Sequence, residues 1–98
     1  MTIQLVAITS INSNADSAIE KYLSVVGPLM QSAGATVVCR YELGDSVAGN
    51  KEIQYVSVIE YPDEAAIKLV FDSDEYQSLG EIKKQAFTKY QVSTAVTV

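Results

Sequence analysis

The sequence has no histidine, no tryptophan and a single cysteine, Cys39. Histidine is the commonest general base near neutral pH and the commonest metal ligand, so its absence argues against both kinds of site. One cysteine cannot form an internal disulfide, and it fits a reducing compartment. The sequence therefore predicts a protein without metal or cofactor, located in the cytoplasm.

Basic residues are also few, with 7 Lys and Arg against 12 Asp and Glu and a net charge of −5. Nucleic-acid binding needs a basic surface that neutralises phosphates, and anionic membranes attract the same charge. No apolar run approaches the ~18 residues of a membrane span, and the first residues do not resemble a signal peptide. We expect neither nucleic acid nor membrane as a partner.

The chain does contain an alternation of strand-like and helix-like stretches. Runs rich in β-branched and aromatic residues predict strands, over residues 3–10, 36–43, 52–61 and 91–98. Apolar residues at spacings of three and four predict a helix from about residue 15 to 33, loosened by Pro28 and ended by Gly34. A second helical stretch begins at Asp63 and restarts at Ser73, which is expected to cap its second half.

The order β-α-β-β-α-β predicts one α+β domain over residues 1–98, with a ferredoxin-like four-stranded antiparallel sheet and its helices on one face. The strands are apolar on both faces: Leu5 opposes Val6, and Val37, Cys39 and Tyr41 are expected on one side of the second strand. Helices cover only one face of such a sheet. A second copy is the simplest cover for the other face, which predicts a homodimer through the sheet.

The chain resembles the dimeric α/β-barrel superfamily, and within it the family called domain of unknown function 1330. The resemblance covers most of the chain and rests on short motifs: Tyr22, Pro28, Gly34, Arg40, Ile59-Glu60-Tyr61-Pro62 and Ser73-Asp74-Glu75-Tyr76. The chain departs from the family at Tyr41-Glu42, where Gly-Gly is frequent, at Asp74, where Pro is frequent, and at Lys83, where Arg is usual. The resemblance implies the fold and no established function. Related barrels include heme-degrading and quinol-type monooxygenases.

Arg40, the only arginine, lies in the middle of a mostly apolar strand and needs an anionic partner. That partner is either a carboxylate, Glu42 or Glu60, or the anion of a ligand. Glu60 in turn is an ion-pair partner of Arg40 or Lys83, or a general base if burial raises its pKa.

Six tyrosines either line an aromatic pocket or serve as half-buried packing, with Tyr22 and Tyr76 the strongest pocket candidates. Ser73 reads as a helix cap rather than a nucleophile, because no base lies near it in the sequence. The candidate ligand-binding residues are Tyr22, Arg40, Glu60, Ser73, Tyr76 and Lys83.

Three functions fit these observations. The first is a homodimeric domain that binds a small aromatic or acidic molecule between helices and sheet. The second is a cofactor-free monooxygenase-like enzyme, and the third is a purely structural dimerisation module. An open pocket lined by Tyr22, Arg40 and Tyr76 favours the first two, whereas a closed helix–sheet layer favours the third.

Overall fold

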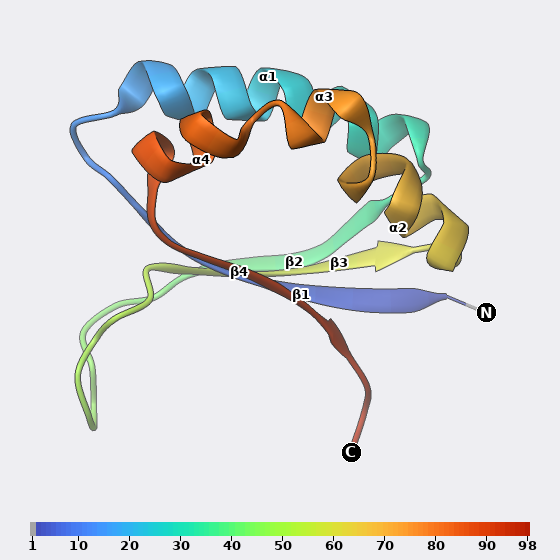
Figure 1. Cartoon of the computed structure of the whole chain (residues 1–98). Coiled ribbons are helices and arrows are strands. Elements are labelled where there is room, and N and C mark those ends of the chain that lie inside the picture. The colour runs from blue at the N-terminus through green and yellow to red at the C-terminus, as the bar shows by residue number, and fades with distance from the viewer. Residues whose placement is uncertain (1) are drawn as a thin grey trace.

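In the computed structural model, which describes residues 2–98, a four-stranded antiparallel sheet carries its helices on one face (Figure 1). The sheet has the order β2-β3-β1-β4. The elements are β1 (Ile3–Ile11), α1 (Asp16–Ser32), β2 (Thr36–Glu42), β3 (Tyr55–Tyr61), α2 (Glu64–Phe71), α3 (Asp74–Gln77), α4 (Gly80–Ala86) and β4 (Phe87–Ala95). This is the predicted ferredoxin-like βαββαβ arrangement, with the second helical segment in three pieces.

Helix α1 packs along the sheet and ends as its sequence predicts. Its apolar spacing buries Tyr22 and Val26. Pro28 lies within the helix rather than ending it. Gly34 has φ +80°, the left-handed conformation that an L side chain rarely adopts, and a Cβ there would lie 3.2 Å from Cγ of Pro62. Glycine is therefore needed where the chain leaves α1 and enters β2.

Helices α2 and α3 start at side-chain caps, whereas α4 has no side-chain cap. Asp63 Oδ1 accepts a hydrogen bond from the Ala66 N–H at 2.8 Å, and Ser73 Oγ accepts one from the Tyr76 N–H at 3.1 Å. Ser73 Oγ also donates to the Val70 carbonyl at 2.7 Å. The predicted cap at Ser73 is confirmed, and its hydroxyl both donates and accepts a hydrogen bond within the backbone of this turn.

Two strand boundaries differ from the predicted ones. β4 begins at Phe87 rather than at residue 91, and β3 begins at Tyr55 rather than at residue 52. Phe87 fits the apolar spacing of α4, yet its φ of −125° and ψ of 135° are extended, and it pairs with Ile11. Pairing with β1 decides this boundary, which local periodicity alone places inside the helix.

A β-bulge in β2 changes which side chains share a face. The pairing shifts between Val37, opposite Ile59, and Cys39, opposite Val58. Val37 therefore faces the helices, whereas Cys39 and Tyr41 face away from them. The prediction that all three share one face is wrong, because the inserted residue resets the alternation.

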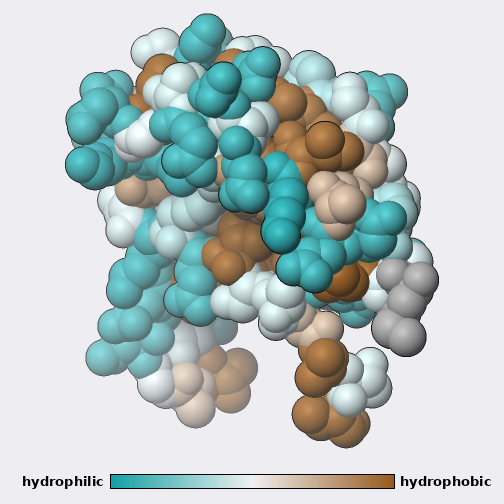
Figure 2. All heavy atoms as spheres, turned by 45° about the vertical axis from the view of Figure 1, so that its right-hand side comes forward, coloured by the Kyte–Doolittle hydropathy of each residue, from teal (hydrophilic) through white to brown (hydrophobic). Residues whose placement is uncertain are grey.

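The middle of the face without helices is apolar, as predicted, whereas β4 contributes the polar side chains Gln91 and Ser93 to it. We call this helix-free face the open face; its apolar side chains are Val6, Ile8, Cys39, Tyr41, Val56 and Val58. The loop between β2 and β3 and the C-terminal end both project beyond this face (Figure 1). Each projection carries exposed apolar side chains, Val47 in the loop and Val96 and Val98 at the end, which contribute apolar surface at both tips (Figure 2).

The core lies on the other side of the sheet, under the helices. Its most deeply buried side chains include Leu5, Tyr61, Val70, Leu79 and Ala86. Among the described helices, none has the length and apolar character needed to cross a bilayer.

Candidate functional site

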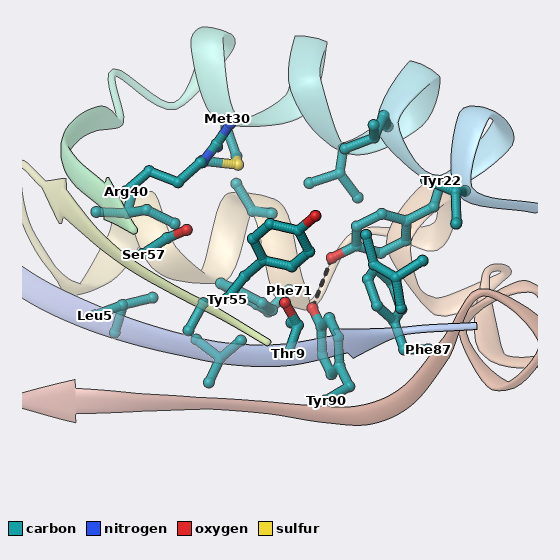
Figure 3. Close-up of a pocket in the computed structure, with 18 of the residues that line it drawn as sticks. Leu5, Thr9, Tyr22, Met30, Arg40, Tyr55, Ser57, Phe71, Phe87 and Tyr90 are labelled. Atoms are coloured by element: carbon teal, nitrogen blue, oxygen red, sulfur yellow. Dashed lines mark hydrogen bonds between the residues drawn. The ribbon is translucent and has the colours of Figure 1, made fainter. Parts of the chain in front are cut away.

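A cavity of about 260 Å³ lies between α1 and the helix-facing side of the sheet (Figure 3). A dry apolar cavity of ~150 Å³ holds a benzene molecule, so this one has room for a substituted ring. Its lining comprises Leu5, Ala7, Thr9 and Ile11 of β1; Ile19, Tyr22, Leu23, Val26 and Met30 of α1; Arg40 of β2; Tyr55, Ser57, Ile59 and Tyr61 of β3; Val70 and Phe71 of α2; and Phe87, Tyr90 and Val92 of β4.

Small residues in the middle of the sheet create this space. Ala7 of β1 lies between Ser57 of β3 and Val92 of β4 in the strand register. Neither Ala7 nor Ser57 has a side chain long enough to reach α1, whereas Tyr55 and Ile59 flank Ser57 on the same face of β3, with Tyr61 beyond Ile59. The floor of the cavity is therefore set by short side chains and its walls by long aromatic and aliphatic ones.

Arg40 lies at one end of the cavity, beside Met30 (Figure 3). Within residues 2–98 the ion pairs all use lysines, and Arg40 forms none. Glu60 alternates with the cavity-lining residues of β3 and so points to the open face. Arg40 is exposed to solvent. The predicted ion pair of Arg40 with Glu42 or Glu60 is absent within residues 2–98, and the guanidinium faces solvent, where an anion can approach it.

Three hydroxyls in the lining are also available. They are the side-chain hydroxyls of Thr9, Ser57 and Tyr55. Within residues 2–98 no buried side-chain oxygen lacks a hydrogen-bond partner, so these hydroxyls are not stranded in the core. Figure 3 shows the Tyr55 hydroxyl pointing away from the sheet toward α1, with the Thr9 hydroxyl below it. These groups offer hydrogen bonds to a molecule in the cavity.

At the other end of the cavity, tyrosine hydroxyls form a continuous chain of hydrogen bonds. Tyr22 Oη and Tyr90 Oη lie 2.7 Å apart (Figure 3), and Tyr90 Oη lies 2.7 Å from Tyr76 Oη. Lys83 Nζ donates to Tyr76 Oη at 3.2 Å. The same ammonium lies 4.4 Å from the centre of the Tyr76 ring and 5.0 Å from that of Tyr90. We call Tyr22, Tyr90 and Tyr76 the tyrosine chain, and Lys83 lies at its end.

Burial keeps these hydroxyls protonated. It raises the pKa of Tyr22 and of Tyr90 well above the ordinary value of 10.0. Burial, with the hydrogen bond to Tyr90, raises the pKa of Tyr76 to about 12 against the lowering effect of Lys83. At neutral pH all three side chains are therefore neutral hydrogen-bond donors.

The structure divides the predicted site residues into three groups. Tyr22 and Arg40 line the cavity. Tyr76 and Lys83 reach it through Tyr90. Ser73 is a helix cap and Glu60 faces the opposite side of the sheet, so neither belongs to the lining.

Four lining residues were not among the predicted site residues: Tyr55, Tyr90, Ala7 and Ser57. A short side chain in the middle of a buried strand indicates that space is left beside it, and Ala7 and Ser57 carry this signal in the sequence. Within residues 2–98, no set of three His, Cys, Asp or Glu side chains is placed to hold a metal ion.

The sequence matches one known protein family over most of its length. Residues 5–95 match the family described as "Domain of unknown function (DUF1330)". The chain belongs to this family. None of the curated proteins matches the sequence.

Solved structures share the architecture of this family member at low sequence identity. A protein of unknown function from Rhodopseudomonas palustris is similar with a TM-score of 0.81 and 16% identity, over 99% of this chain and 82% of that one. An ethyl tert-butyl ether d (ethd) family protein from Bacillus halodurans has a TM-score of 0.63 and 17% identity, over 100% of both chains. A dimeric protein of unknown function and ferredoxin-like fold from Bacteroides fragilis has a TM-score of 0.57 and 6% identity, over 96% and 94%. These likenesses confirm the ferredoxin-like fold.

Proposed function

We propose that this domain binds a small aromatic acid in the cavity between α1 and the sheet. The observation that carries the proposal is an unpaired guanidinium, that of Arg40, at the edge of an apolar cavity with room for one substituted ring. Arginine binds a carboxylate through two parallel hydrogen bonds, and the aromatic and aliphatic lining suits a ring.

The expected affinity is modest. Burial of one ring contributes roughly 2–3 kcal/mol, and a charge-assisted interaction with Arg40 contributes roughly 1.5–3 kcal/mol. Their sum, about 3.5–6 kcal/mol, corresponds to a dissociation constant of about 0.04–3 mM. An affinity in this range is measurable by calorimetry or by ligand-detected NMR.

The test is calorimetric titration with benzoate and with benzamide, which has the same ring and no charge. Arg40→Gln is expected to weaken benzoate binding about tenfold and to leave benzamide binding nearly unchanged. The control variant Lys68→Gln removes the same charge from an exposed position on α2 and should bind both as the wild type does. Equal losses for the two ligands in Arg40→Gln would contradict the proposal.

An enzyme that oxygenates an activated ring without a cofactor is the alternative. Such a reaction needs a base to deprotonate the substrate. The described lining has no carboxylate, and its buried tyrosines hold their protons tightly. These observations favour binding over turnover. Oxygen uptake with hydroquinone as substrate, lost in Tyr22→Phe, would instead support the enzyme.

We also propose that the domain is a homodimer joined through the open face. The open face has no helix over it, and apolar side chains lie on both projections that extend beyond it. A second copy placed there would contact the sheet and both projections at once. Because the cavity lies on the other side of the sheet, dimerisation would leave it accessible, so a purely structural role does not account for the cavity.

A further inference from the structure

The tyrosine chain has one more hydrogen than its own hydrogen bonds can use. Tyr22, Tyr90 and Tyr76 have three hydroxyl hydrogens, but only two hydrogen bonds join their oxygens. Each tyrosine hydroxyl has a single hydrogen to donate. One O–H therefore has no acceptor among these three oxygens, in whichever direction the bonds run.

The position of Lys83 determines which of the three hydroxyls has no acceptor. Its ammonium has only donors, so Tyr76 Oη must accept the hydrogen bond at 3.2 Å. The positive charge repels hydroxyl hydrogens and orients each O–H away from itself. Tyr76 then donates to Tyr90 and Tyr90 to Tyr22, and the remaining hydrogen is on Tyr22. Both Tyr90 and Tyr22 line the cavity.

The charge of Lys83 acts on this chain because nothing closer neutralises it. In the described chain the ion pairs of lysine involve Lys68, Lys84 and Lys89, and Lys83 is not among them. Lys83 is partly buried against the rings of Tyr76 and Tyr90. A partly desolvated ammonium polarises its hydrogen-bond acceptor more strongly than one in water does.

We infer that Lys83, Tyr76 and Tyr90 polarise the Tyr22 hydroxyl so that it donates a hydrogen bond to an acceptor oxygen on the ring of the bound ligand. This inference rests on the proposed binding function and narrows the ligand class. The ligand carries an oxygen without a hydrogen of its own, a phenolate or a ring carbonyl, at the end of the cavity opposite Arg40 in Figure 3. A ligand that presents a hydroxyl hydrogen at that end is disfavoured, because it meets a donor.

The probe is 4-nitrophenolate, whose visible absorption band moves to shorter wavelength when its oxygen accepts a hydrogen bond. Nitrobenzene has the same ring and lacks that oxygen. The titrations are run at about pH 9, below the ordinary tyrosine pKa of about 10. We expect the wild type to shift the band and to bind the phenolate more tightly than nitrobenzene.

Lys83→Met is expected to weaken phenolate binding about tenfold and to reduce the band shift, with nitrobenzene binding unchanged. Tyr22→Phe removes the proposed donor and should abolish the shift of the phenolate absorption band on binding. Lys84→Met is the matched control, because the neighbouring lysine is exposed and pairs with Glu81 at 3.6 Å. It removes the same charge and should behave as the wild type.

The outcomes separate the two proposals. If both probes bind but Lys83→Met and Lys84→Met behave alike, the tyrosine chain has no role and this inference is overturned, while the cavity remains a binding site. If Lys83→Met weakens the binding of nitrobenzene as much as the binding of the phenolate, the role of Lys83 is structural and the inference also fails. If neither the two probes nor benzoate bind the wild type, the proposed function itself is overturned.

Discussion

Among the described residues, Arg40 is the only charged side chain in the cavity lining. Because it has no carboxylate partner within residues 2–98, Arg40→Met leaves no charge uncompensated there. We expect the free energy of unfolding to change by no more than about 0.5 kcal/mol. Urea denaturation measures this. Val70→Ala, at a fully buried side chain, serves as the positive control and should cost about 2 kcal/mol. A loss of several kcal/mol in Arg40→Met would reveal a carboxylate partner outside this chain.

The buried tyrosines predict a loss of stability at high pH. Since the folded pKa of Tyr76 is about 12 and the ordinary value is 10.0, the unfolded chain releases this proton first. The contribution is fully present below about pH 10 and is lost as the pH rises toward about 12. Tyr22 and Tyr90 act in the same direction.

Urea midpoints measured between about pH 9 and 12 test this prediction. Tyr76→Phe should give a shallower decline than the wild type. Identical slopes for Tyr76→Phe and the wild type would mean that Tyr76 ionises alike in both states.

Single residues of the site were only partly predictable. Tyr22 is found in the lining because the apolar face of its helix locates it by local spacing, whereas the face that Arg40 occupies depends on the bulge in β2. Tyr90 is harder, because its place opposite Thr9 depends on the register between β4 and β1. Register is a long-range property, and a shift of one residue would turn Tyr90 to the open face.

At the scale of elements, the end of α1 depends on a glycine. Gly34→Ala places a side chain at φ +80° and 3.2 Å from Cγ of Pro62. We expect it to cost about 1–2 kcal/mol in the free energy of unfolding. Gly80→Ala is the comparison, since nothing lies within 4 Å of the added Cβ and its φ is not positive. It should be neutral or stabilise by up to ~1 kcal/mol. If thermal denaturation shows the same change in stability for Gly34→Ala and Gly80→Ala, the left-handed conformation at Gly34 does not require glycine.

The element order was predictable, whereas two details of the strands were not. Periodicity and turn residues identify all four strands and both helical segments. The bulge after Val37 leaves no mark in the sequence, yet it turns Arg40 toward the cavity and Cys39 away from it. The start of β4 at Phe87 also follows from pairing with β1, which local spacing does not contain.

At the scale of the whole molecule, the open face predicts a dimer. Val56→Lys places a charge in the middle of that face and should give a monomer by sedimentation velocity at micromolar concentration. A stable contact would bury at least ~1,200 Å² in total. The control Leu69→Lys alters an exposed side chain on α2 and should remain dimeric. A wild-type protein that sediments as a monomer would contradict the proposed assembly.

The central claim is that the helix-facing cavity binds a small aromatic acid, and methyl NMR tests it most directly. The protein is labelled at Leu, Val, Ile and Met methyl groups and titrated with benzoate. Shift changes are expected at Leu5, Val26 and Met30, which line the cavity, while Val6 and Val58 on the open face remain unchanged. Changes confined to the open face, or none at saturating benzoate, would contradict the claim.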